Sequence, residues 1–178
     1  MRSIEFRRIT HAPQWSVGGG NIEVLEYLVD GVSFLELVRR AELPDALAEQ
    51  AERTAEFAPD PAPLLAGTYM YLPGLTVEHL LGAKADAAPH GVDEGETMLL
   101  GCDCGVFECW ALTATITADE DTVTWSSLRN TYRDWNYDSL GTLTFARPQY
   151  ETSLRAACTA IRTRPRRRGE PVQRPGDA

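Results

Sequence analysis

The sequence lacks the patterns by which the common enzyme and membrane-protein classes are recognised. It contains no P-loop, no dinucleotide-binding fingerprint, no nucleophile elbow and no H-E-x-x-H zinc motif, and it has only three histidines for acid–base work. No apolar run approaches the roughly 20 residues of a membrane-spanning helix, and the N-terminal residues lack the apolar segment of a signal peptide. We therefore expect a cytoplasmic protein with no membrane association.

Basic charge is scarce outside one short segment. The net charge is −9, but residues 163–178 carry five arginines against two acidic residues, which leaves −12 on residues 1–162. A body this acidic repels phosphate backbones, so nucleic-acid binding is disfavoured unless the arginine-rich segment acts alone as a tether. Three prolines and no apolar periodicity predict that residues 163–178 form a disordered basic tail.

Composition is ordinary in the remaining respects. With 43% hydrophobic and 24% charged residues, the chain can bury a sizeable core. Residues 1–162 are the length of one domain, so a single domain is expected there. The sequence carries no signal of an oligomeric state.

The first third of the chain predicts a hairpin followed by helix. Apolar residues recur in residues 4–9 and 23–29, on either side of three consecutive glycines, which predicts two paired strands. Ser33 and Glu36 match a capping box, so a helix should begin there. Pro44 should stop or redirect that helix near Leu43, and a second, weaker helix is expected over residues 45–57.

The middle of the chain predicts a long covering loop. Residues 58–95 contain five prolines and several glycines, so irregular backbone should dominate, apart from a short helix over residues 76–81. Such a loop either covers a core or lines a site.

The clearest β signal follows this loop. Residues 96–128 alternate apolar and polar side chains, and a four-residue loop at 118–121 would pair Ile116 with Val123. A last strand is expected over residues 142–146. Pro148 then fits the first turn of a helix whose apolar stripe is Tyr150, Leu154, Ala157, Cys158 and Ile161.

The order of these elements predicts the fold class. No alternation of strand and helix of the kind that builds parallel sheets is present. We expect an α+β fold, with a largely antiparallel β-sheet and helices packed on one face, in a single domain.

Three of the four cysteines lie within eight residues, in the stretch G-C-D-C-G-V-F-E-C-W. Cys102 and Cys104 are two residues apart, so on a strand they point to the same side. A register that pairs Cys104 with Trp110 and Cys102 with Leu112 leaves Cys109 in the turn, where its thiol can reach the other two.

Three interpretations of this cluster stay open. Free cysteine is among the most buried residue types, so simple packing is the ordinary explanation. A disulfide or redox pair between Cys104 and Cys109 is a second, although a reducing cytosol disfavours a stable disulfide. A zinc site is the third, and zinc prefers four ligands. The fourth ligand would be His90, the best placed, or one of His11, His79 and Cys158, the last being expected to pack in the core.

A second group of residues combines aromatic and charged side chains. Arg129, Arg133, Asp134, Trp135 and Tyr137 follow a predicted strand, and such mixtures are found where surfaces bind partners. The ordinary explanation is that the two aromatic residues cover the sheet's edge while the charged groups pair in solvent.

Four stretches of the chain occur in a characteristic order: L-L-G-C-D-C-G-V-F-E-C-W-A-L at 99–112, V-T-W-S-S-L at 123–128, R-D-W-N-Y at 133–137 and L-T-F-A-R-P-Q-Y-E at 143–151. In these stretches the sequence resembles a family of bacterial proteins that carry a GCxCGxxxCW motif, a resemblance that implies no particular activity. Members of this family commonly have glycine where this chain has Glu108 and proline where it has Ala111.

Two hypotheses of function follow from the sequence. The first is a non-enzymatic binding protein, of an accessory or immunity type, whose acidic surface binds a basic protein partner. The alternative is a small metalloprotein or enzyme in which Cys102, Cys104 and Cys109 form a zinc or redox site.

Overall fold

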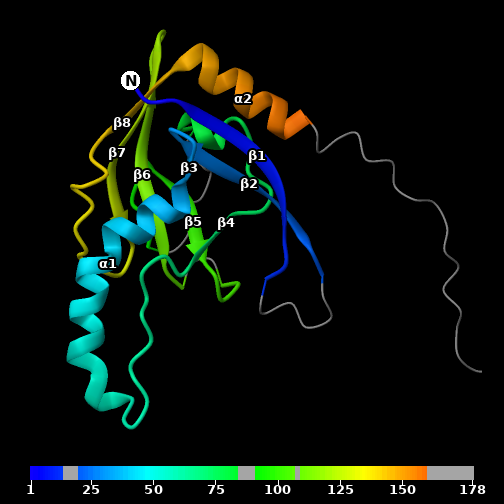
Figure 1. Cartoon of the computed structure of the whole chain (residues 1–178). Coiled ribbons are helices and arrows are strands. Elements are labelled where there is room, and N and C mark those ends of the chain that lie inside the picture. The colour runs from blue at the N-terminus through cyan, green and yellow to red at the C-terminus, as the bar shows by residue number, and fades with distance from the viewer. Residues whose placement is uncertain (14–19, 84–90, 107–108, 160–178) are drawn as a thin grey trace, which may run out of the picture.

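Strands dominate the fold and form two antiparallel sheets (Figure 1). The structure, a computed structural model, describes residues 1–13, 20–83, 91–106 and 109–159. The smaller sheet contains β1 (Ile4–His11), β2 (Ile22–Val29) and β3 (Val32–Ser33). The larger sheet contains, in spatial order, β4 (Tyr69–Tyr71), β5 (Glu96–Cys102), β6 (Ala111–Ala118), β7 (Thr122–Asn130) and β8 (Leu143–Ala146). The helices are α1 (Phe34–Arg53), α2 (Arg147–Thr159) and the short 3₁₀ turns η1 (Thr54–Glu56) and η2 (His79–Leu81).

The two sheets are joined at both of their edges. Isolated bridges link Arg2 to Phe145 of β8 and Val24 of β2 to Pro73, just after β4. Trp125 of β7 is fully buried, and its ring lies 5.8 Å from that of Tyr27 in the smaller sheet. The hydrophobic core therefore lies between the sheets.

Both helices add aromatic side chains to this same core. Phe34, at the start of α1, lies 5.4 Å from Trp125 between ring centroids. Tyr150 of α2 lies 5.0 Å from Phe6 of β1 and also contacts Phe145 of β8. The predicted α+β class is confirmed. The strands divide between two sheets, and the buried faces of the helices contact both.

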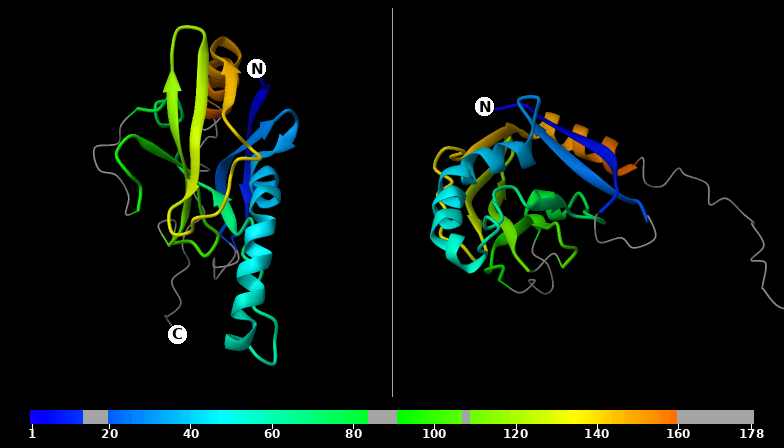
Figure 2. Two further views of the ribbon diagram at one scale, coloured as in Figure 1. Left: turned by 90° about the vertical axis from the view of Figure 1, so that its left-hand side faces the viewer. Right: turned by 60° about the horizontal axis from the view of Figure 1, so that its bottom comes forward.

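Pro44 does not stop the first helix, but α1 changes direction along its length (Figure 1), so of the two predicted effects redirection is the one observed. Helix α1 continues through Pro44 to Arg53, beyond the end of the sheets (Figures 1 and 2), so the expected second helix is its C-terminal half. Proline removes one helical hydrogen bond, but side chains on both sides of it are held in the core. Those buried side chains are Phe34, Val38, Ala41, Glu42 and Ala46.

The predicted capping box does not form at the start of α1. Ser33 makes no side-chain cap, and Glu36 instead accepts hydrogen bonds from Arg39 and Arg40. The hydroxyl of Tyr71 in β4 accepts the N–H of Leu35, at 3.2 Å. A residue distant in sequence therefore satisfies the helix start, which a local motif does not reveal.

The hairpins exist where the sequence predicts them, but their registers are shifted by two residues. Ile116 pairs with Trp125 rather than with Val123, because Asp119 and Thr122 close a tighter turn. The same shift occurs between β5 and β6, where Leu100 pairs with Leu112. A two-residue shift keeps side chains on their predicted faces near the turns. A bulge between Met98 and Leu100 and another between Thr113 and Thr115 shift the registers further.

The remaining expectations have mixed outcomes. Strand β4 lies inside the segment expected to be irregular, whereas β8 and α2 lie where expected, with Tyr150, Leu154 and Ala157 buried. Among the described residues, no helix has the length and apolar character needed to cross a bilayer. Ile161 and the predicted tail lie outside the described residues.

Candidate metal centre and its surroundings

The three clustered cysteines meet at one end of the larger sheet. Cys102 is the last residue of β5, and Cys104 and Cys109 lie in the connection to β6. The three sulfur atoms all lie within 4.8 Å of one another. Cys102 is buried and the other two are exposed, so the cluster sits at the surface with one ligand reaching inward.

A tight turn brings the first two thiols together. Gly105, with φ +90°, donates its N–H to the carbonyl of Cys102 at 3.3 Å. Glycine suits this left-handed conformation because it has no side chain to clash with the backbone. The N–H of Cys104 points to the sulfur of Cys102 at 3.4 Å. Cys109 is placed by its own N–H, which donates to the carbonyl of Val106 at 2.9 Å.

Trp110 anchors the cysteine connection to the rest of the sheet. Its indole N–H donates to the carbonyl of Thr68 at 3.1 Å, and the N–H of Asp103 donates to the same carbonyl. Tyr69, the next residue, pairs with Cys102 across the β4–β5 ladder. Both ends of this connection between Cys102 and Trp110, hereafter the cysteine turn, are therefore fixed against residues 68–69.

The surroundings of Cys102 and Cys104 shift the pKa values of their thiols in opposite directions. Burial raises the pKa of Cys102 to about 12, whereas a hydrogen bond from Cys102 lowers the pKa of Cys104. Of these two thiols, Cys104 therefore ionises at the lower pH. Metal binding at Cys102 has to displace a strongly held proton, so affinity should rise with pH.

The sulfur positions suit a thiophilic metal ion. Zinc–sulfur bonds of ~2.3 Å in tetrahedral geometry place sulfurs about 3.8 Å apart, so the present spacing within 4.8 Å needs to close by about 1 Å at most. No other histidine, cysteine, aspartate or glutamate of the described residues belongs to this group. His79 hydrogen-bonds to the carbonyl of Met98, and Cys158 is half-buried on α2. His90 lies outside the described residues, and its role as fourth ligand stays a prediction.

Arg133 connects the cysteine turn to α1. Its guanidinium lies 4.2 Å from the ring centroid of Trp110 and 5.2 Å from that of Trp135. It also donates to both carboxylate oxygens of Glu49, at 2.9 and 3.2 Å. A planar cation stacked on aromatic rings and paired in this bidentate way holds three segments together.

A second polar cluster lies beside the cysteines, in the interior. Glu42 is fully buried, and one of its carboxylate oxygens accepts hydrogen bonds from Tyr69 at 2.7 Å and from Tyr137 at 2.6 Å. Its other oxygen accepts the N–H of Gly67 at 2.8 Å, and Asn130 donates to the Tyr69 hydroxyl. Burial raises the pKa of Glu42, although these hydrogen bonds oppose the rise.

The predicted contact residues have different surroundings. Arg129 pairs with Glu96 and Asp93, away from the aromatic stack, and Tyr137 is buried with its hydroxyl on Glu42. Arg133 and Trp135 stack together, whereas Asp134 is exposed. The five residues therefore do not form one surface.

The Glu42 cluster is not among the sites predicted from the sequence. A signal for it exists, because Glu42 follows Phe34 and Val38 at four-residue spacing and so falls on the apolar face of its helix. An acidic residue on such a face indicates a buried polar partner. The partners themselves come from distant segments and leave no local pattern.

Comparisons with protein-family models, with curated proteins and with solved structures give no match. The resemblance to bacterial proteins with a GCxCGxxxCW motif stays a prediction. A proposal of function therefore rests on the residues of this chain and their contacts.

Proposed function

We propose that the protein is a zinc-binding protein in which Cys102, Cys104 and Cys109 hold one structural ion. The observation that supports this most is the convergence of three sulfurs within 4.8 Å at a turn built from backbone hydrogen bonds. Two of the thiols are exposed, so packing does not account for them. Thiolates are soft ligands that favour zinc and related ions over hard cations.

A structural role follows from how the turn is attached. A zinc ion would join the ends of a connection that Trp110 already fixes to Thr68 and to Arg133. Zinc binding to residues that are brought together only in the folded chain adds its binding free energy to folding stability. Loss of the metal should therefore loosen the cysteine turn and lower the stability of the fold.

The test is a metal and thiol count on protein purified without chelator. We expect about one equivalent of zinc, lost in the triple variant Cys102→Ser, Cys104→Ser, Cys109→Ser and kept in Cys158→Ser. The Cys158 variant is a matched control because this residue lies on α2, outside the cluster. Protein that contains no metal and four reactive thiols would leave packing as the explanation. If only two of the four thiols react and no metal is present, a Cys104–Cys109 disulfide is indicated instead.

A second function, binding of a basic protein partner, is favoured by charge. Residues 1–162 carry a net −12, and acidic side chains are exposed on α1 (Glu52), on η1 (Glu56) and on the segment after β7 (Asp134 and Asp138). Complementary charge raises association rates and is screened by salt. Binding to poly-L-arginine that is strong at 50 mM salt and lost at 500 mM is the expected result, and no binding at low salt would contradict it.

A further inference from the structure

Strand β7 loses its neighbour on one side half-way along its length. Strand β8 pairs with it only from Thr122 to Trp125, where Leu143 is the last partner. Before Leu143 the chain turns away at Gly141, with φ +57°, and Ser127 of β7 also has a positive φ, of 52°. In the described part of the chain, no strand pairs with β7 beyond Trp125 on this side. An unpaired strand edge offers backbone donors and acceptors to another chain.

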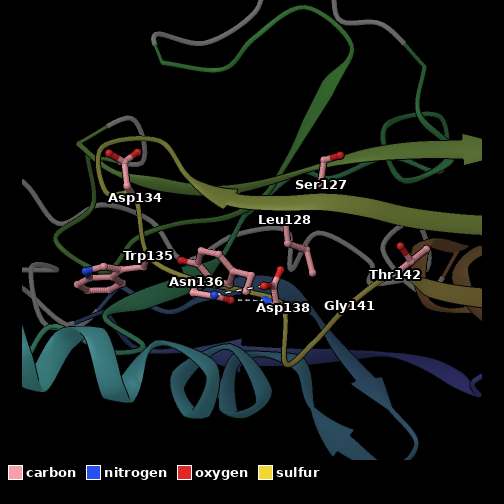
Figure 3. A pocket seen from close by; sticks show the side chains of 9 residues that line it. Ser127, Leu128, Asp134, Trp135, Asn136, Asp138, Gly141 and Thr142 are labelled. Carbon is pink, nitrogen blue, oxygen red and sulfur yellow. Dashed lines mark hydrogen bonds between the residues drawn. The ribbon is translucent and has the colours of Figure 1, made fainter.

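A pocket lies where β8 would continue. Its volume is about 480 Å³, which is within the usual range of ligand sites. Figure 3 shows Ser127 and Leu128 of β7 on one side and the segment 134–138 on the other. The full lining is Ser127, Leu128, Asp134, Trp135, Asn136, Tyr137, Asp138, Gly141 and Thr142.

The far wall of the pocket is held in place. The N–H of Asn136 donates to the carboxylate of Asp45 on α1 at 2.7 Å. The Asn136 side chain accepts the N–H of Asp138 at 2.6 Å and donates to its carboxylate at 3.2 Å. Trp135 is fixed by its contact with Arg133. The wall is thus preorganised, which lowers the entropic cost of binding.

The lining has a single sign of charge. Asp134 and Asp138 are both exposed, and among the residues that the structure describes, no lysine, arginine or histidine lines the pocket. Figure 3 shows Asp134 and Asp138 apart from each other along the pocket, so each carboxylate matches a separate arginine or lysine side chain. Trp135 adds an aromatic ring, on whose face such a side chain can stack.

We propose that this pocket binds an extended segment of a basic partner protein. The backbone of the segment pairs with the free edge of β7 at Ser127 and Leu128, and separate arginine or lysine side chains of the segment contact Asp134 and Asp138. Addition of a strand to a sheet edge supplies affinity through main-chain hydrogen bonds, and a charged pocket supplies selectivity. This inference rests on the second function proposed above and names its site.

The test uses the full chain and the peptide Ac-Val-Arg-Val-Arg-Val-amide, with backbone N–H shifts followed by NMR. We expect the shifts to concentrate at Ser127, Leu128 and residues 134–138. The double variant Asp134→Asn, Asp138→Asn should weaken binding about tenfold or more. The matched control Glu120→Gln, Asp121→Asn removes the same charge from the β6–β7 turn and should bind normally.

Three outcomes would overturn the proposal. The first is equal binding of a peptide N-methylated on its backbone, because this would exclude strand pairing. The second is equal binding by the variant and control proteins. The third is binding that appears only when Arg166, Arg167 and Arg168 are replaced by glutamine, because the chain's own basic segment would then be the occupant.

Poly-L-arginine separates this inference from the function on which it rests. If the pocket variant binds poly-L-arginine as tightly as the unmodified protein does, the polymer binds at another part of the acidic surface, and only the assignment to this pocket fails. If the unmodified protein binds neither polymer nor peptide, both proposals fail.

Discussion

The cysteine turn and the Glu42 cluster are neighbours with opposite character. Tyr69 touches both, because it pairs with Cys102 in the β4–β5 ladder and its hydroxyl donates to Glu42. Around Glu42, both carboxylate oxygens have hydrogen-bond donors within the chain. Around the cysteines, three potential ligands converge, two of them exposed to solvent. A complete polar network stabilises a fold, whereas an incomplete one at the surface points to something that binds.

The largest expected effect concerns the metal ligands. Structural zinc sites bind with apparent free energies of about 10–16 kcal/mol, so one thiolate among three or four contributes about 4 kcal/mol. Replacing Cys102 by serine should therefore weaken zinc binding about a thousandfold, measured by competition with a chromophoric chelator. Cys158→Ser should leave the zinc affinity unchanged. Equal zinc affinities of the Cys102 and Cys158 variants would contradict the role of Cys102 as a zinc ligand, and with it the contrast between the cysteine turn and the Glu42 cluster.

The second effect concerns the buried carboxylate. Glu42→Ala leaves the hydroxyls of Tyr69 and Tyr137 and the N–H of Gly67 without their acceptor in a buried place. We expect a loss of about 3 kcal/mol in the free energy of unfolding, measured with urea. Glu52→Ala, on the exposed side of the same helix, should change it by less than about 0.5 kcal/mol. Similar values for the two variants would contradict a structural role for the cluster.

A pH series on Glu42→Gln sharpens the same point. Because burial raises the pKa of Glu42, the folded protein binds this proton more tightly than the unfolded chain does. Above about pH 4.3, the ordinary pKa of glutamate, the stability of the unmodified protein should fall relative to that of Glu42→Gln, until the raised pKa is passed. Unfolding midpoints of the two proteins, taken at matched pH values, measure this difference. A constant difference across the series would contradict a raised pKa of Glu42 in the folded protein.

The smallest expected effect concerns the link between the two regions. Arg133→Lys keeps the charge but loses the bidentate pair with Glu49 and the flat stack on Trp110, which should cost about 1 kcal/mol of stability. Arg129→Lys is the matched control, since Arg129 also pairs in a bidentate way, with Glu96, but stacks on no aromatic ring of the described residues. If the stack matters, only the Arg133 variant should also change the zinc affinity. Equal effects of both variants on zinc affinity would contradict a link through Trp110.

Local patterns predicted much of this fold, and long-range contacts account for the differences. The alternation around Trp125 and the apolar stripe of α2 were sufficient for the hairpins and the last helix. Pro44 does not stop α1, because buried side chains on both sides of it outweigh the hydrogen bond that proline removes. The capping box predicted at Ser33 does not form, because the hydroxyl of Tyr71, from another strand, accepts the N–H of Leu35 instead.

The candidate site divides in the same way. Spacing alone indicated that Cys102, Cys104 and Cys109 could meet, since all three lie within one turn. The register was wrong by two residues because the loop is fixed by Trp110 and Thr68, which are 42 residues apart. The pocket beside Ser127 depends on where β8 leaves β7, and periodicity carries no information about that point.

The most direct test of the account is the X-ray absorption spectrum of the zinc-bound protein at the zinc edge. Coordination by Cys102, Cys104 and Cys109 predicts three sulfur neighbours at about 2.3 Å and one lighter neighbour at about 2.0–2.1 Å. A zinc shell made only of nitrogen and oxygen would show that the ion binds elsewhere, and would contradict the claim that the cysteine turn is a metal centre.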